Sequence, residues 1–599
     1  MLRSAVACSH GLRAGAIVRR AMAGGLVQRL MSSTATASPT EEAGWTYDHD
    51  VLVVGGGIVG CSLACRLAQD IAPRTSHQGG VAQTGTKNGV SDGAPKRPSV
   101  RLVEARPPST ATMPTLGENK KPDPRVYALS PGSVKVLRSL GVWEGGGADG
   151  GSGLRAWSQE FRGMQVWDDR GPGFLHFDGD TPGKPLGYVS EHGLLHSALF
   201  RRVKDFEAEG VVELTAPAQV KRVAFPPVGK GGSRGPITVT LETAPGKTSD
   251  VTCRLLVAAD GGDSKVARML GLSSWGWGYG QRAVVATVRL AGESHGETAF
   301  QRYLSRGPLA VLPLKDGLAS LVWSTTPEHA ELLKSMTEQN FLAELNDALT
   351  RPPAAHGLAM STASGSSLET SPIFPSPEGL FPSFSTLLSG AGAGGQVIPG
   401  TLGVSKVVGG VSALATPPMA AAKAVAEGFV KGAEGVAGAL MGLSMGLGGG
   451  GGGGFSTPPQ AVEILTPRLG FDLSLRQAYA YTGARAALVG DAAHTVHQMA
   501  GQGLNLGIAD ADALARAVLE GRLSGTDVGS KTLLSRYEQE RKASLSLVMM
   551  GALDSLHRLF GAEGRAAAAV RSAGLSALNA AGPVKRRLAR HAMGGGSLK

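Results

Sequence analysis

Three glycines early in the chain could hold a phosphate-containing cofactor. Gly55, Gly57 and Gly60 form the pattern G-x-G-x-x-G between an apolar run at residues 50–54 and a second one at residues 61–69. In a strand–turn–helix unit the first glycine permits a tight turn, the second lets the backbone approach a pyrophosphate, and the third allows close packing of helix on strand. The helix N-terminus presents free N–H groups to the phosphates. The spacing predicts a dinucleotide site, and a glycine turn without a cofactor is the alternative.

An acidic residue that could bind a ribose lies at the end of the next predicted strand, residues 99–105. Glu104 follows Gly60 by 44 residues, whereas about 20 are expected in this fingerprint. Residues 74–98 are rich in Gly, Ser, Thr and Lys, and excising these 25 residues leaves a spacing of 19. We interpret the segment as a flexible insertion and expect Glu104 to accept hydrogen bonds from ribose hydroxyl groups. An ordinary surface glutamate is the alternative.

Two later segments place carboxylates and glycines directly after predicted strands. One follows residues 254–259, and the other follows residues 486–489 and runs through GDAAH to AGQGLNLG at the start of a predicted helix. The residues of interest are Asp260, Gly261, Asp491, Ala492, Gly501, Gly503, Leu504 and Asn505. Turns and helix caps also favour Asp, Gly and Ser. Ordinary capping is therefore the alternative for each segment taken alone.

The glycine motif at residues 55–60 and the two later carboxylate segments, in this order, resemble the motifs of the class A flavoprotein aromatic hydroxylases, which share the para-hydroxybenzoate hydroxylase fold. Within that group the chain is similar to the mitochondrial members of the ubiquinone-biosynthesis hydroxylase family. Further similarity lies in residues 123–143, 281–288, 298–314, 321–325 and 537–541. The resemblance implies an α/β (α+β) fold: a Rossmann-like FAD-binding domain is intertwined with a substrate domain built on a mixed or antiparallel sheet, and C-terminal helices follow.

The resemblance also implies a chemistry. It indicates an FAD-dependent monooxygenase that hydroxylates the aromatic ring of a polyprenylated phenol or hydroxybenzoate in ubiquinone (coenzyme Q) biosynthesis, through a flavin C4a-hydroperoxide. O2 is then a co-substrate, and electrons come from NAD(P)H or from a ferredoxin and its reductase. Other ubiquinone-biosynthesis proteins in a membrane-associated complex are the implied partners. The sequence assigns no catalytic side chain, because such a hydroxylation needs mainly positioning and exclusion of water.

Several residues acquire roles through the resemblance. Asp491 is expected to accept a hydrogen bond from a ribityl hydroxyl, while the backbone N–H of Ala492 meets the pyrophosphate. Arg125 would lie near the pyrophosphate. Asp260 and Gly261 would serve FAD and the route of the reductant.

The segment after the second carboxylate motif would border the flavin ring. Gly501 and Gly503 would let the chain pass the isoalloxazine without a side-chain collision. The N–H groups of Leu504 and Asn505, at a helix start, would face the carbonyl oxygen at flavin position 2 and stabilise negative charge there.

Two departures from the family keep other functions open. Gln498 stands where the family usually has a proline beside the flavin, and residues 352–457 form a low-complexity insertion. One alternative is another FAD-dependent oxidoreductase of the same fold, such as an epoxidase or a prenyl reductase. The other is a flavin-bearing assembly subunit of the quinone-biosynthesis complex with weakened catalysis.

The net charge of +11 over 599 residues is concentrated at the two ends of the chain. Residues 1–40 contain five arginines and no acid, and residues 565–599 contain seven basic residues and no acid. The first composition is typical of a mitochondrial transit peptide, with a plastid peptide or a disordered arm as alternatives. The basic tail could dock peripherally on an anionic membrane, here the matrix side of the mitochondrial inner membrane, with a solvated tail or a partner contact as the alternatives. The body between them is nearly neutral. Nucleic-acid binding is not favoured, because the tail lacks interleaved aromatic residues and the cofactor motifs account for the body.

Cysteine and histidine usage predicts neither disulfides nor a metal site. Four cysteines are too few for a disulfide framework in so long a chain. Cys61 and Cys65 share one helix face and are interpreted as packing residues, with a redox pair as the alternative. His494 and His497 have no Cys or carboxylate at ligand spacing. No stretch is apolar enough to predict a transmembrane helix.

The motifs and the composition together divide the chain. Residues 282–290, 309–314 and 318–325 predict strands of the substrate sheet, and its aromatic residues, such as Trp167, Tyr303 and Trp323, are expected in the core, with a pocket lining as the alternative. The predicted parts are 1–40 transit peptide, 46–160, 188–275 and 485–530 FAD-binding domain, 161–187, 276–351 and 458–484 substrate domain, 352–457 insertion, and 531–599 C-terminal helices and basic tail.

Overall fold

The computed structural model describes residues 47–71, 99–107, 121–145, 153–171, 173–178, 184–225, 228–229, 232–233, 235–292, 297–351, 455–497, 501–543, 559–561 and 565–582. The predicted transit peptide, the insertion at 74–98, nearly all of the insertion at 352–457, Gln498 and the end of the basic tail lie outside the described residues. Within the described part, no helix combines the length and apolar character needed to cross a bilayer.

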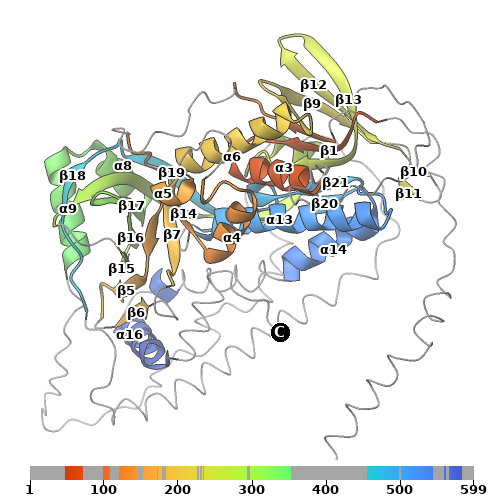
Figure 1. Ribbon diagram of the computed structural model, residues 1–599. Helices are drawn as coiled ribbons and strands as arrows, with labels where there is room; N and C mark the ends of the chain where they lie inside the picture. Colours follow the sequence, from red (N-terminus) through yellow and green to blue (C-terminus); the bar gives the residue numbers. More distant parts are fainter. Residues whose placement is uncertain are drawn as a thin grey trace, which may run out of the picture.

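A parallel sheet carries the glycine motif. Its strand order is β20-β21-β13-β1-β2-β8, and β21, β13, β1, β2 and β8 run parallel. Strand β1 lies between β13 and β2, so Val51–Val54 are buried on both faces, which explains their continuous apolar sequence. Strands β12 and β9 extend β13 as an antiparallel arm (Figure 1). The strands are β1 (His49–Val54), β2 (Val100–Val103), β8 (Val212–Thr215), β9 (Gln219–Ala224), β12 (Ile237–Ala244), β13 (Lys247–Ala258), β20 (Thr482–Gly483) and β21 (Ala486–Leu488).

Helices cover this sheet. Helix α3 is the crossover between β1 and β2, and it packs between α6 and α13, with α14 against α13 (Figure 1). The apolar face of α3 explains this arrangement, because Leu63, Leu67 and both of its cysteines are fully buried. The helices are α3 (Ile58–Ile71), α4 (Pro131–Ser139), α5 (Leu154–Trp157), α6 (His192–Ala208), α7 (Lys265–Met269), α13 (Gln502–Leu523) and α14 (Lys531–Arg541).

A second, mostly antiparallel sheet has the order β22-β19-β14-β17-β16-β15-β5-β6, with β18 on β14. Its core contains Trp167 and Trp323 and is covered by α8 and α9, whereas α16 packs on β5 and β6 (Figure 1). The elements are β5 (Gly163–Asp168), β6 (Phe174–Asp178), β14 (Ser274–Leu290), β15 (Thr298–Leu304), β16 (Gly307–Pro313), β17 (Leu318–Thr325), β18 (Ala461–Ile464), β19 (Leu469–Ala478), β22 (His494–Thr495), α8 (Pro327–Ser335), α9 (Glu338–Thr350) and α16 (Arg565–Ala580).

Two smaller sheets complete the described strands. One has the order β3-β7-β4, from β3 (Val126–Leu129), β7 (Gly187–Glu191) and β4 (Gln159–Phe161), and the other pairs β10 (Val228–Gly229) with β11 (Gly232–Ser233). A 3₁₀ turn, η2 (Gly490–Ala492), connects β21 to β22.

The mixed α/β architecture is the one that the motifs predict. The strands predicted at residues 282–290, 309–314 and 318–325 are confirmed as parts of β14, β16 and β17. Trp167, Tyr303 and Trp323 are buried core side chains, at most 8% exposed, as expected. Cys61 and Cys65 are buried free thiols whose pKa values burial raises, as expected of packing residues. The predicted domain boundaries remain a prediction.

Candidate cofactor site

The glycine turn follows β1 directly. Gly55 has a φ of +111°, and a Cβ there would collide with the carbonyl oxygen of Ala259. A Cβ on Gly60 would collide with the carbonyl oxygen of Gly55, which explains how α3 can begin so close to the strand. Gly57 differs from both, because it is exposed and a Cβ on it would meet nothing within 4 Å. Open space therefore adjoins the backbone where the pattern predicts a pyrophosphate.

Glu104 follows β2 and reaches back to this turn. Its Oε2 accepts a hydrogen bond of 2.6 Å from the backbone N–H of Gly56, and its Oε1 accepts one of 2.9 Å from the N–H of Arg106. On the other side of Gly56, His196 of α6 donates from Nε2 to the carbonyl oxygen at 2.8 Å. The predicted ribose-binding carboxylate is thus held beside the glycine turn despite the insertion between them.

Asp260 and Gly261 follow β13. The carboxylate of Asp260 caps α7, because it accepts hydrogen bonds from the Ser264 hydroxyl at 2.5 Å and from the N–H of Lys265 at 2.8 Å. Gly261 has a φ of +89°, which glycine adopts without strain. The capping alternative thus describes the Asp260 contacts in this structure.

Asp491 and Ala492 belong to η2, which is separated from β21 by one residue, Val489. The preceding Gly490 has a φ of +60°, and its N–H donates to Oδ2 of Asp510 at 2.9 Å. Asp491 is solvent-accessible, but the surrounding protein raises the pKa of its carboxyl group mainly by desolvation, with His494 lowering it. An accessible carboxylate in such surroundings suits a hydroxyl ligand.

The start of α13 is tied to the corner between β3 and α4. Gly501 is the N-cap residue and has a φ of +58°. Asn505 accepts hydrogen bonds at Oδ1 from the N–H of Ser130 at 2.8 Å and from the Ser133 hydroxyl at 2.7 Å, and its Nδ2 donates to the carbonyl oxygen of Ala128 at 2.8 Å. These hydrogen bonds hold the first turn of α13, which includes Gly503 and Leu504 of the predicted flavin-facing segment, against the corner between β3 and α4.

Two polar residues that the sequence motifs did not name, Tyr127 and His192, lie near the predicted Arg125. Tyr127 of β3 lies near Asp491, whose charge, after burial, raises the pKa of the phenol. The Tyr127 hydroxyl lies 3.3 Å from Nδ1 of His192. Burial, followed by the nearby Arg125, lowers the pKa of His192 to about 4. Arg125 itself is half exposed and paired with Asp123 at 3.3 Å. The four-residue spacing of His192 and His196, which places both on one helix face, is the signal that could have drawn attention to this region.

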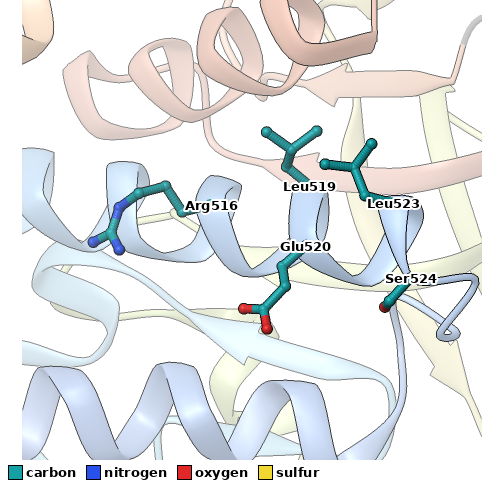
Figure 2. Close-up of a pocket in the computed structure, with 5 residues that line it drawn as sticks. All are labelled: Arg516, Leu519, Glu520, Leu523 and Ser524. Atoms are coloured by element: carbon teal, nitrogen blue, oxygen red, sulfur yellow. The ribbon is translucent and has the colours of Figure 1, made fainter. Parts of the chain in front are cut away.

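These residues fit FAD. Gly55, Glu104, Asp260 and Asp491 all follow the carboxyl ends of strands in one parallel sheet, β1, β2, β13 and β21. That edge is where open α/β sheets bind their ligands. A hollow elsewhere on α13, lined by Arg516, Leu519, Glu520, Leu523 and Ser524, contains none of the residues predicted for the cofactor (Figure 2).

Comparisons with known proteins support FAD as the cofactor. A family model described as an FAD binding domain matches residues 461–552. The mitochondrial ubiquinone biosynthesis monooxygenase COQ6 of Xenopus tropicalis is 30% identical, over 90% of this chain and 92% of that protein. The human COQ6 protein is also 30% identical, over 90% of this chain and 91% of its own length.

A solved structure shows the same fold. The p-nitrophenol 4-monooxygenase PnpA from Pseudomonas putida DLL-E4 superposes with a TM-score of 0.53 at 15% identity, covering 92% of this chain and 99% of that one. The sequence similarity to these COQ6 proteins covers 90% of this chain. The chain belongs to the ubiquinone biosynthesis monooxygenase COQ6 family and is an FAD-dependent monooxygenase.

Proposed function

We propose that this enzyme hydroxylates the aromatic ring of a polyprenylated phenol or hydroxybenzoate intermediate of ubiquinone biosynthesis. The observation that carries the proposal is the 30% identity to COQ6 proteins over 90% of the chain. The second sheet supports it, because an extended antiparallel layer can cover a flavin ring and keep water from an aromatic substrate.

Each part of FAD has candidate ligands on this chain. The pyrophosphate would lie against Gly57 and the N-terminus of α3, with Arg125 and the N–H of Ala492 nearby. The adenosine ribose would donate hydrogen bonds to Glu104, and a ribityl hydroxyl to Asp491. The Asp260 carboxylate already accepts hydrogen bonds from the start of α7. Its proposed contribution to FAD binding is therefore indirect: it fixes the turn at Gly261 that would lie beside the cofactor.

The flavin ring would lie against the start of α13. Gly501 and Gly503 leave room for it, and the N–H groups of Leu504 and Asn505 stabilise negative charge on its pyrimidine ring. When bound and reduced, FAD supplies the electrons with which O2 is activated for transfer of one oxygen atom to the substrate. The protein orients the substrate ring and excludes water.

The cellular setting is part of the proposal. The relatives are named as mitochondrial proteins, and residues 1–40 have the composition of a transit peptide. We place the enzyme on the matrix side of the inner membrane, held peripherally by its basic tail and by other ubiquinone-biosynthesis proteins. Its electrons come from NAD(P)H or from a ferredoxin with its reductase.

Product analysis tests the reaction. Cells that lack the gene should accumulate a prenylated precursor lacking one ring oxygen, and normal quinone levels would contradict the proposal. The purified protein should show the absorption spectrum of bound flavin. Protein that stays colourless and cannot be reconstituted with FAD would reject the cofactor assignment as well.

A further inference from the structure

A fully buried carboxylate lies behind the turn that contains Asp491 and Ala492. Asp510 of α13 is 0% exposed. Its Oδ2 accepts hydrogen bonds from the N–H of Gly490 at 2.9 Å and from Nε2 of His494 at 2.6 Å. Its Oδ1 accepts one of 2.5 Å from Nε of Arg541, the last residue of α14. One side chain thus connects η2, β22, α13 and α14, and α13 and α14 lie side by side in Figure 1.

Two of the groups that bind Asp510, Gly490 and His494, lie on either side of the proposed cofactor contacts in the sequence. Gly490 comes directly before Asp491 and Ala492, and His494 follows them by two residues. Both ends of this short segment are therefore bound to the same carboxylate, with Asp491, Ala492 and Ala493 between them. Gly490 has a φ of +60°, a conformation open to glycine, and its N–H is aimed at the Asp510 carboxylate.

Packing alone does not explain such a network. A buried ion pair must be desolvated, and apolar side chains of similar size often stabilise a fold as well or better. Asp510 is nevertheless kept ionised: burial raises its pKa, but the charges of His494 and Arg541 together bring it below the ordinary value. The other titratable groups facing it are Asp491 and Tyr537.

We propose that Asp510, held by Arg541 and His494, is the positioning residue of the cofactor turn: it fixes where Asp491 and Ala492 present their groups to FAD without itself touching FAD. This inference rests on the proposed contact between Asp491 and FAD. It goes beyond that contact, because it assigns the geometry of the turn to a carboxylate on another helix and makes the end of α14 part of the cofactor site.

The chain offers a matched control. Asp168 of β5 and Arg571 of α16 form a second buried ion pair, 2.8 Å from Oδ2 to Nε and at most 2% exposed, that belongs to the other sheet. The variants Asp510→Asn and Asp168→Asn therefore impose the same chemical change in two buried ion pairs. Asparagine has the shape of aspartate but only one acceptor oxygen, so its NH2 group must face a donor at position 510.

The experiment measures the dissociation constant of FAD with apoprotein, together with the visible circular dichroism of bound flavin. We expect Asp510→Asn to weaken FAD binding by about tenfold or more and to change the flavin spectrum. Asp168→Asn should leave both within twofold of wild type, even if it lowers thermal stability as much. The milder Arg541→Lys keeps the positive charge and carries the test if Asp510→Asn does not fold.

Asp491→Ala distinguishes the proposed contact between Asp491 and FAD from the positioning role of Asp510. It should weaken FAD binding, and the double variant Asp491→Ala/Asp510→Asn should weaken it by less than the product of the single effects, because both act through one contact. Weakening by Asp491→Ala but not by Asp510→Asn overturns the positioning role alone. Unchanged binding in Asp491→Ala overturns the cofactor contact and the positioning role with it. Equal weakening by Asp168→Asn overturns the positioning role as well.

Discussion

The carboxylate of Glu104 and the backbone N–H of Gly56 are joined by a hydrogen bond of 2.6 Å, which ties the end of β2 to the turn after β1. The second oxygen of the same carboxylate accepts the N–H of Arg106. A carboxylate offers about four acceptor positions, so Glu104 retains the capacity to bind hydroxyl groups while its own position is fixed from the backbone.

Glu104→Gln should therefore weaken cofactor binding without unfolding the protein. Glutamine keeps one oxygen for the N–H of Gly56, but it removes the charge and one acceptor that a ribose would use. We expect the FAD dissociation constant to rise about tenfold, measured by fluorescence titration of the apoprotein. Glu144→Gln, which changes a half-exposed surface pair, is the control. Identical affinities for the two variants would contradict the role of Glu104.

Two substitutions in the glycine turn should have different effects, one on the stability of the apoprotein and the other on its affinity for FAD. Gly60→Ala should destabilise the apoprotein by roughly 1–3 kcal/mol, because the new methyl group collides with the carbonyl oxygen of Gly55. Gly57→Ala meets no atom within 4 Å, so it should leave apoprotein stability unchanged. It should nevertheless weaken FAD binding by about tenfold or more, since the methyl group occupies the approach of the pyrophosphate. Denaturant unfolding and FAD titration of both variants check this, and an unaffected FAD affinity in Gly57→Ala would place the pyrophosphate elsewhere.

His192 predicts a pH dependence of stability. Its pKa in the folded protein is about 4, lowered mainly by burial, whereas an unfolded histidine titrates near 6.5. Between these values the unfolded chain binds the extra proton, so this contribution to stability is complete above about pH 6.5 and is lost as the pH falls toward 4. His192→Asn, which can still bond to Tyr127, should flatten the fall in melting temperature across that window. An unchanged slope would contradict the assignment.

The pair of Asp168 and Arg571 predicts how the C-terminal helix is held. Arg571→Ala leaves a buried carboxylate without its partner and should destabilise the protein by about 3–5 kcal/mol. The double variant Asp168→Leu/Arg571→Met removes both charges and should recover much of that loss. Urea unfolding measures both. If the single variant is as stable as wild type, the ion pair does not hold α16 to β5.

Local patterns predicted the parts of the site that depend on a few neighbouring residues. The strand, glycine turn and helix at residues 50–69 could be predicted because each glycine has a steric reason that is visible in the spacing. Glu104 could be predicted once the insertion was removed from the count. Assigning FAD depended on the later motifs and their resemblance to a known family.

Contacts between distant residues could not be predicted in the same way. The side chain of Asn505 binds Ser130 across 375 residues, whereas the sequence suggested only its backbone N–H. The bond from His196 to Gly56 and the network around Asp510 likewise depend on how helices pack, which no short pattern contains. For Asp260, the local pattern predicted the contact that the structure shows, because its carboxylate accepts hydrogen bonds from the start of α7. The role of Asp260 toward FAD is implied only by the family resemblance.

The position of β21 has a consequence for biosynthesis. Strands β1, β2, β8 and β13 are complete by residue 258, but β21, which pairs with Leu256–Ala258, begins only at residue 486. A growing chain therefore carries an unfinished parallel sheet through more than 220 further residues of synthesis. During that interval the open edge of β13 can pair with other chains. With the proposed flavin contacts at the start of α13, the flavin is captured only after the ribosome has passed that point, so a chain truncated earlier is an aggregation hazard rather than a weak enzyme.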